Sequence, residues 1–209
     1  MRQDVNSTPQ RLRQRHAELT RRAILDTARR LFTEDGYATT PIRKLAEQAG
    51  VAVPTIYATF GSKPGVLMGL LDLMDTELVE PIAQRLMQAD DPGDMLDLMS
   101  ALERQGREAG ADVLRLVMQA AASEPEVARV LEEGFDRHRD GVARVCERLD
   151  KGGHLRRGLT LQDATATALA LTSMEVYDEV VRHQGWSHDQ YQNWLARTLR
   201  HALLDKRPI

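Results

Sequence analysis

The chain has 209 residues, of which 28 are Lys or Arg and 31 are Asp or Glu. With 42% hydrophobic and 28% charged residues, the composition is that of a globular protein and excludes the disordered and fibrous classes. No apolar run approaches the roughly 18 to 20 residues of a membrane span. The first ten residues lack the apolar segment of a secretory signal, and the single cysteine, Cys146, cannot form an internal disulfide. We therefore expect a cytoplasmic protein.

Charge is unevenly distributed along the chain. Up to Lys63 there are 11 basic and 6 acidic residues, a net charge of +5, whereas the remainder has 17 basic and 25 acidic residues, a net charge of -8. A basic front on an acidic body is typical of a protein whose front meets a polyanion, although a solvated basic face explains the charge equally well. Four arginines lie at the N-terminus: Arg2, Arg11, Arg13 and Arg15. These arginines are consistent with an arm that follows a nucleic acid and with a terminus that makes no lasting contacts, and the second interpretation is favoured.

Helical periodicity is plentiful and strand signals are scarce, so the chain is predicted to be all-α. The first helix is expected over about 17–34, ending at Gly36, because one apolar face unites Ile24, Leu25, Ala28, Leu31 and Phe32. A second helix is expected to begin at Thr40 as N-cap, with Pro41 in the first helical position, and to end at Gly50.

A short third helix, predicted over 54–60, completes a helix-turn-helix. Ile56 and Phe60 are spaced i, i+4 and are expected to point inward, which leaves outside Thr55, Tyr57, Ala58 and Thr59. Threonine hydroxyls can bond base edges or phosphates, Tyr57 can reach a phosphate, and Ala58 can touch a thymine methyl. The spacing alone also fits a generic helical hairpin that binds no DNA.

Further helices are predicted over about 64–78, 94–108, 112–122, 126–150, 161–183 and 187–205, separated by short breaks that contain glycine or proline. One of these breaks is expected at Ala109–Gly110. The predicted organisation is a flexible arm over 1–15, a three-helix DNA-binding domain over 16–63, and a larger helical domain over 64–209 for ligand binding and dimerisation.

The segment from Thr39 to Lys63 resembles the signature of the TetR family of bacterial transcriptional regulators: TTPIRKLAEQAGVAVPTIYATFGSK. The preceding helix, including the pair Gly36–Tyr37, matches the family as well, so the resemblance is strong over roughly residues 20–70 and weak beyond. It implies a homodimer that binds a palindromic DNA operator through the helix-turn-helix and a small-molecule inducer through the C-terminal domain.

The resemblance also implies which residues meet DNA: Thr40, Arg43, Val53, Pro54, Thr55, Tyr57, Ala58, Thr59 and Lys63. Of these, Thr40, Tyr57 and Lys63 occupy positions that commonly contact phosphates in family members. Two positions depart from the pattern, because Ala52 replaces a frequent capping serine and Pro54 replaces a frequent glycine or polar residue. The third helix has few long side chains for bidentate base contacts, so DNA shape is expected to supply part of the specificity.

The candidate dimer face lies on the last two helices. It comprises Ala166, Ala170, Tyr191, Trp194, Leu195, Thr198, Leu199 and Ala202. Small residues let helices approach closely and aromatic residues are enriched at interfaces, which together with the resemblance favours an interface between subunits. The alternative is that the stripe forms the core of one subunit.

The candidate ligand-binding residues have soft or polar side chains and lie on the predicted helices of the C-terminal domain. They are Met99, Arg115, Met118, His138, Met174, Glu175 and Tyr177. Methionine adapts to varied apolar ligands, although core filling is the plainer explanation for any single one. No motif supports this set.

Signals for an enzyme or a metal protein are missing from the sequence. It contains no nucleophile elbow, no phosphate-binding glycine loop and no zinc-helix motif, and its six histidines are scattered. We therefore expect no catalysis, cofactor or metal, and for Cys146 a buried thiol rather than a redox sensor. The favoured function is a repressor released by a small apolar or amphipathic inducer. The alternative is a helical protein that binds a ligand or partner without specific DNA recognition.

Overall fold

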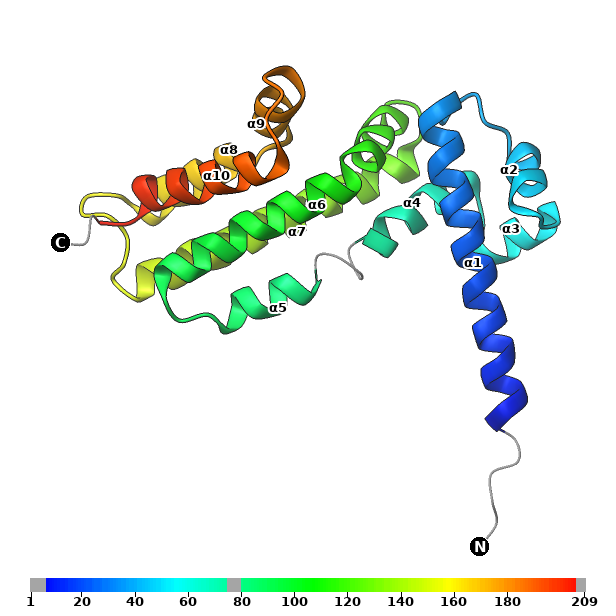
Figure 1. Cartoon of the computed structure of the whole chain (residues 1–209), viewed down its shortest axis with the longest axis horizontal. Helices are drawn as coiled ribbons and strands as arrows, with labels where there is room; N and C mark the ends of the chain where they lie inside the picture. The colour runs from blue at the N-terminus through cyan, green and yellow to red at the C-terminus, as the bar shows by residue number, and fades with distance from the viewer. Residues whose placement is uncertain (1–6, 75–79, 206–209) are drawn as a thin grey trace, which may run out of the picture. The chain divides into compact units, whose positions relative to one another are not determined.

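The computed structural model of the chain describes residues 7–74 and 80–205, with side chains over 11–73 and 80–205. Its helices (Figure 1) are α1 (Ser7–Asp35), α2 (Ile42–Ala49), α3 (Val53–Phe60), α4 (Lys63–Met74), α5 (Glu80–Gln88), α6 (Pro92–Ala121), α7 (Pro125–Lys151), α8 (Leu161–Leu171), α9 (Met174–Tyr177) and α10 (His188–Leu203). A π-helical segment over Asp178–His183 follows α9 directly. Within the described ranges the β-structure is a single isolated bridge between Leu155 and Leu204, so the all-α prediction is confirmed. None of the described helices is long and apolar enough to cross a membrane.

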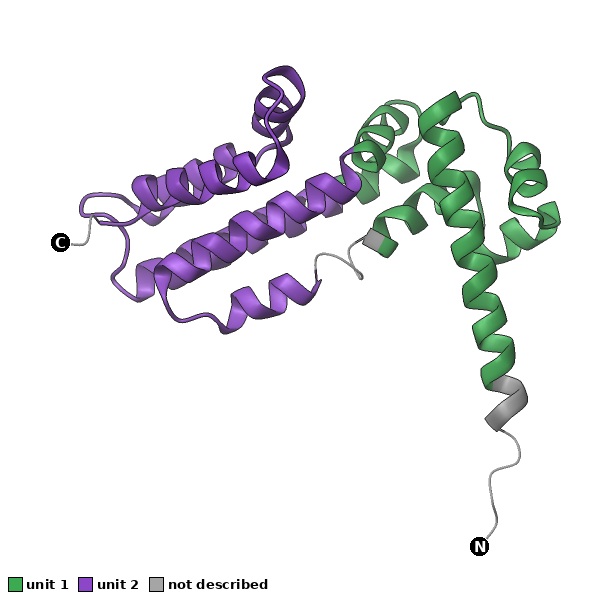
Figure 2. Cartoon of the chain, in the orientation of Figure 1, with its two compact units in different colours: residues 1–73, 112–131 green, residues 74–111, 132–209 purple. Residues whose placement is uncertain are grey.

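Two compact units share these helices (Figure 2). Unit 1 consists of residues 1–73 and 112–131, and unit 2 consists of residues 74–111 and 132–209. Helices α6 and α7 each contribute residues to both units. The predicted boundary between the DNA-binding and ligand-binding domains, after Lys63, stays a prediction.

The core of unit 1 is built on α1. All five residues of its predicted apolar stripe are buried: Ile24, Leu25, Ala28, Leu31 and Phe32. Helix α2 packs against both α1 and α3, and it buries Leu45 and Ala46 while α3 buries Ile56. Gly36 and Gly50 have φ of +89° and +67°, the left-handed conformation that glycine adopts without a steric penalty and that ends a helix sharply. These local signals explain why the helix-turn-helix forms where it was predicted.

Unit 1 departs from the prediction at two helix starts. Helix α1 begins at Ser7, ahead of the predicted start near residue 17, and every side chain over 11–19 is exposed, so no apolar stripe marks this extension. Helix α2 begins at Ile42, and the predicted capping role of Thr40 is wrong, because Pro41 is the N-cap. The hydroxyl of Thr40 instead donates to the carbonyl oxygen of Gly36 at 2.8 Å.

The later helices also differ in their ends. The predicted break at Ala109–Gly110 is wrong, because α6 runs unbroken from Pro92 to Ala121 and Gly110 is buried within it. Helix α5 was not predicted; one buried residue, Leu86, is too weak a periodic signal. The predicted end of the preceding helix at Leu78 lies outside the described residues.

The predicted helix over 161–183 is interrupted after α8. Ser173 caps α9 there, because its side-chain oxygen accepts a hydrogen bond from the amide of Val176 at 3.3 Å. Helix α10 begins as expected near residue 187, where Ser187 and Gln190 form a reciprocal capping box. Helices α8 and α10 pack against each other in unit 2.

Candidate nucleic-acid interface and ligand site

The turn between α2 and α3 is fixed by backbone hydrogen bonds. The amide of Gly50 reaches the last carbonyls of α2, and the amide of Val51 donates to Ala46 O at 3.0 Å. Helix α3 starts without a side-chain cap, since Ala52 offers none, and Pro54 supports its first turn with a preset φ. The departure at Ala52 from the family pattern therefore leaves the helix intact.

Helix α3 presents an uncharged face to solvent. Ile56 is fully buried, while the side chain of Tyr57 is 50% exposed and Pro54, Ala58 and Thr59 are also exposed. The hydroxyl of Thr59 donates to the Thr55 carbonyl oxygen at 2.8 Å and retains its acceptor lone pairs. The predicted exposure of these residues is confirmed, except that Thr55 and the inward Phe60 are both half-buried. Because α3 has no acidic residue, nothing on it repels a phosphate.

Basic side chains flank this face. The side chain of Arg43 on α2 is 84% exposed and pairs with Glu47 at 3.1 Å. The Nζ atom of Lys63 lies 4.4 Å from the centroid of the Tyr37 ring and 3.4 Å from the Ala38 carbonyl oxygen. Burial lowers the pKa of Lys63, and the nearby Glu124 carboxylate opposes that shift. These contacts hold the ammonium group of Lys63 beside the helix-turn-helix.

One of the predicted DNA-contacting side chains points away from solvent. Thr40 is 1% exposed, its hydroxyl donates to Gly36 O, and its amide donates to Tyr37 O at 3.3 Å. The expectation that Thr40 offers its hydroxyl to a phosphate is therefore corrected: it ties the loop before α2 to the end of α1. The other predicted DNA-contacting residues are exposed or, like Val53, half-buried, so they reach the surface.

The candidate dimer face divides into two parts. Tyr191, Leu195 and Leu199 are fully buried within a single protomer, so their assignment to the dimer face is corrected and the alternative interpretation, a subunit core, applies to them. The remainder reaches the surface: Ala166 and Ala170 are exposed on α8, and Trp194, Thr198 and Ala202 are half-buried on α10. The stripe combined two neighbouring faces of α10, one turned inward and one turned outward.

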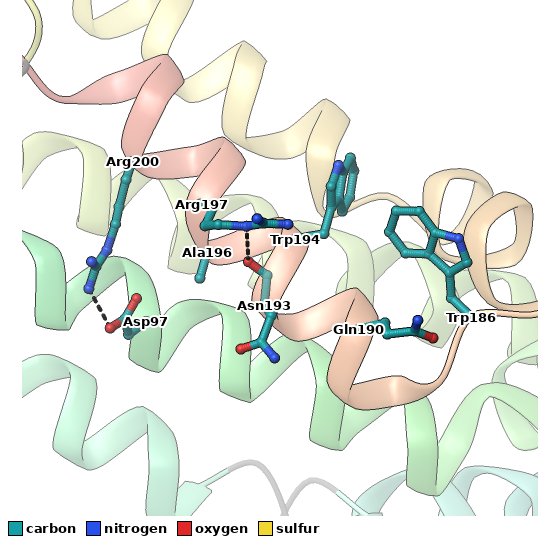
Figure 3. Close-up of a pocket in the computed structure, with 8 residues that line it drawn as sticks. All are labelled: Asp97, Trp186, Gln190, Asn193, Trp194, Ala196, Arg197 and Arg200. Atoms are coloured by element: carbon teal, nitrogen blue, oxygen red, sulfur yellow. Dashed lines mark hydrogen bonds and ion pairs between the residues drawn. The ribbon is translucent and has the colours of Figure 1, made fainter.

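A surface pocket of about 710 Å³ lies along α10 (Figure 3). It is lined by Asp97, Trp186, Gln190, Asn193, Trp194, Ala196, Arg197 and Arg200. The rings of Trp186 and Trp194 meet edge to face at 5.9 Å, and Arg200 forms an ion pair with Asp97. None of the predicted ligand-binding residues lines this pocket.

A second feature of unit 2 is a buried polar cluster centred on Glu103, which we call the Glu103 cluster. The Glu103 carboxylate is 2.9 Å from His138 Nε2 and 3.3 Å from Arg107 Nη2. Arg107 also donates to the Thr172 carbonyl oxygen at 2.9 Å and contacts the Met174 sulfur at 3.5 Å. The cluster therefore joins α6 to α7 and to the junction of α8 with α9.

Two tyrosines extend the cluster. The Tyr177 hydroxyl lies 3.0 Å from His188 Nε2, and the rings of Tyr177 and Tyr191 meet edge to face at 5.2 Å. Burial, together with the charge of Glu103, raises the pKa of Tyr191, while Arg107 opposes the shift. Among the described residues, the Tyr191 hydroxyl and the Nε atoms of Arg104 and Arg107 are buried without a hydrogen-bond partner.

The structure brings together part of the predicted ligand-binding set. His138, Met174 and Tyr177 meet in the Glu103 cluster, and Met99 is buried one helical turn before Glu103. Glu175 is exposed, and Arg115 and Met118 belong to unit 1, so these three residues do not join the cluster. Sequence reasoning missed Glu103 and Arg107, although their spacing of four continues the buried face that contains Met99.

Comparison with known proteins agrees with the helix-turn-helix. Residues 24–68 match the family model described as bacterial regulatory proteins, tetR family. The HTH-type transcriptional repressor Rv3405c of Mycobacterium tuberculosis is 35% identical over 85 residues, which are 41% of this chain and 42% of the relative. The chain thus matches less than half the length of this curated relative.

Solved structures resemble a larger share of the chain. NalD, the secondary repressor of the MexAB-OprM multidrug efflux pump in Pseudomonas aeruginosa, has a TM-score of 0.70 and 22% identity, covering 92% of this chain and 99% of NalD. FadR from Bacillus subtilis, in complex with stearoyl-CoA, has a TM-score of 0.70 and 20% identity, covering 86% of this chain and 97% of FadR. At these identities the likeness shows a shared fold.

Proposed function

Because the chain belongs to the TetR family of bacterial transcriptional regulators, we propose that it binds a palindromic DNA operator as a homodimer and represses transcription until a small molecule releases it. The observation that carries this proposal is the solvent face of α3. Tyr57, which is half exposed, and the exposed Pro54, Ala58 and Thr59 lie on this face, and α3 has no acidic residue. The basic residues Arg43 and Lys63 flank it on neighbouring elements. Such a face fits the major groove, where phosphates surround an accessible row of base edges.

The proposed DNA contacts divide into phosphate contacts and base contacts. Arg43 and Lys63 supply positive charge for phosphates, and the Tyr57 hydroxyl donates to a phosphate, which fixes the position of the protein without reading sequence. Thr55, Ala58 and Thr59 face the base edges, where hydroxyls and a methyl group discriminate bases. The long α1 extension places Arg11, Arg13 and Arg15 in solvent, but the proposal does not depend on them.

A homodimer would supply the second reading helix. The exposed part of the candidate dimer face, Ala166 and Ala170 with Trp194, Thr198 and Ala202, is the surface we propose for pairing. Two-fold symmetry would then place two α3 helices about 34 Å apart, matching half-sites separated by one turn of DNA.

The ligand proposal rests on the size and helical fold of unit 2. FadR, which shares the fold, is in complex with stearoyl-CoA, and for this chain we propose an apolar or amphipathic inducer. Helix α4 leads from the helix-turn-helix towards the remainder of the chain and is the proposed route of coupling. An inducer shifts the operator-binding equilibrium only by its difference in affinity for the two states, typically about 1–3 kcal/mol.

The test begins with selection of bound duplexes from a random pool by the purified full chain. Affinity for the selected duplex should fall linearly on a logarithmic salt scale, with a slope of about -0.9 per phosphate contact. Tyr57→Ala should weaken binding by about tenfold, because it removes a charge-assisted hydrogen bond. Phe135→Ala is the matched control, since Phe135 is an exposed aromatic residue of unit 2, and it should leave DNA affinity unchanged.

Two results would refute the proposal. Weak binding to every duplex with a flat salt dependence would favour the alternative, a helical protein that binds a ligand or partner without specific DNA recognition. Equal losses in the Tyr57 and Phe135 variants would show that α3 is not the reading element.

A further inference from the structure

The Glu103 cluster contains buried hydrogen-bond donors that have no partner among the described residues. Tyr191 is fully buried and its hydroxyl is unpaired among the described residues, as is the Nε–H of the neighbouring Arg107. The two residues meet the same short helix, because the Tyr191 ring packs edge to face on Tyr177 of α9 at 5.2 Å and Arg107 contacts the sulfur of Met174 on α9 at 3.5 Å. Buried polar groups are nearly always satisfied, so a group of unpaired donors in one core indicates a missing acceptor.

The charges in the cluster define the missing partner further. Glu103 and Arg107 already neutralise each other at 3.3 Å, and both side chains are at most 13% exposed. A ligand that added a second charge here would leave that charge buried without a counterion, which is costly. A neutral group with lone pairs, such as the oxygen of a ketone or an ester, would satisfy the donors without this cost.

The surroundings of the unpaired donors are apolar. Met174 and Tyr177 are buried beside Arg107 and Tyr191, and Met99 lies one turn earlier on α6. Methionine side chains adapt to ligands of different shape, and aromatic rings bury large apolar area. The body of the ligand is therefore expected to be hydrocarbon.

From these observations we propose that the Glu103 cluster is the effector site of unit 2, and that it binds a small apolar molecule through a neutral carbonyl oxygen that accepts hydrogen bonds from Tyr191 and Arg107. The inference deepens the proposed function, on which it rests for the meaning of the ligand as an inducer. It separates this ligand class from carboxylates and amines of the same carbon skeleton.

Two matched series of probes test the proposal by titration calorimetry on the full chain. The first series is methyl octanoate, octanoate and octylamine; the second is acetophenone, benzoate and benzylamine. In at least one series the neutral carbonyl compound should bind at least about tenfold more tightly than both charged members, since an uncompensated buried charge costs well over the free energy of a tenfold change. Absence of binding by both neutral compounds, or a charged member that binds as tightly as the neutral compound in every series that binds, would overturn the proposal.

Tyr191→Phe tests the site itself, because it removes the hydroxyl and keeps the ring. Binding of the neutral probe should weaken by about fivefold, as expected for loss of one neutral hydrogen bond. The thermal midpoint of the free protein should not fall, since the hydroxyl has no protein partner to lose. Tyr37→Phe is the matched control: it removes another buried, unpaired hydroxyl, in unit 1, and should leave probe affinity unchanged.

The outcomes distinguish this inference from the proposed function. Unchanged probe affinity in Tyr191→Phe would overturn the proposed site. If the thermal midpoint also fell, the result would indicate a structural water bound to the Tyr191 hydroxyl. Operator binding by the ligand-free protein is measured separately and should be the same in wild type and Tyr191→Phe. If the ligand-free wild-type protein did not bind an operator, the proposed function would be refuted, and the calorimetric test of the site would be unaffected.

Discussion

Gly65, in the first turn of α4, allows α3 and α4 to meet closely. Its amide donates to the Ser62 side-chain oxygen at 3.0 Å, which starts α4 directly after α3. A Cβ atom at Gly65 would lie 1.9 Å from the carbonyl oxygen of Phe60 and 3.0 Å from its carbonyl carbon. Both are backbone atoms, so Gly65→Ala requires the end of α3 or the start of α4 to move.

The change in the free energy of unfolding of Gly65→Ala follows from three contributions. Alanine gains about 1 kcal/mol over glycine in a helix, whereas overpacking typically costs about 1–3 kcal/mol. The Phe60 carbonyl also accepts a hydrogen bond from the Ser62 amide at 2.9 Å. Its disruption costs about 1 kcal/mol more. Gly65→Ala should therefore lower the free energy of unfolding by about 1–3 kcal/mol and weaken operator binding, because α3 ends at the displaced residue.

Gly141→Ala is the matched control within α7. The nearest atom to its added Cβ would be Arg144 Nη2 at 4.0 Å, so the helix gain should remain and stabilise the protein by about 0.5–1 kcal/mol. Urea unfolding followed by circular dichroism measures both variants, and operator affinity is measured on the same preparations. A Gly65→Ala protein as stable as Gly141→Ala would refute the steric argument.

Three further predictions concern titration, an ion pair and the thiol. Burial, aided by two nearby glutamates, raises the pKa of Tyr37 to about 12 from 10.0. The contribution of Tyr37 to stability is therefore intact below pH 10 and should be lost between pH 10 and 12, by up to about 3 kcal/mol. Denaturation at graded pH should show this loss in wild type and a flatter profile in Tyr37→Phe. A double-mutant cycle on the bidentate pair Arg29–Asp112, at 2.8 and 2.9 Å and partly exposed, should give a coupling of about 1 kcal/mol or less. A coupling well above that value would contradict the expected screening of the pair by solvent. Burial raises the pKa of the Cys146 thiol, which should react with a thiol reagent in denaturant but hardly at all in the folded protein, whereas fast native reaction would support redox sensing.

The helix-turn-helix was predictable because its signals are local. The stripe of α1 repeats within one helix, and Gly50 needs only its own positive φ to end α2. Thr40 shows the limit of such reasoning, since a threonine before a proline suits a helix cap in sequence. Its actual role, a bond to Gly36 O, depends on how the preceding loop folds back.

The helices of unit 2 were harder to delimit because tertiary burial outweighs local preference. Gly110 suggests a break, yet it is buried inside α6, where packing maintains a helix that glycine alone would weaken by about 1 kcal/mol. The stripe on α10 was ambiguous for a related reason. Tyr191 and Trp194 are three residues apart, and only the packed structure shows that the first faces the core and the second the surface.

Sequence patterns found only the outer members of the Glu103 cluster and missed its centre, Glu103 and Arg107. Glu103 and Arg107 are spaced four apart, and such pairs usually lie on the solvent face of a helix, where they contribute only a few tenths of a kcal/mol. Their burial is decided by partners far along the chain: His138 is 35 residues beyond Glu103, and Thr172 is 65 residues beyond Arg107. No periodicity connects residues at such separations. A chain that buries these charges and leaves Tyr191 unpaired among them retains an unfavourable arrangement, and a functional partner for those donors is the explanation that the calorimetric series can refute.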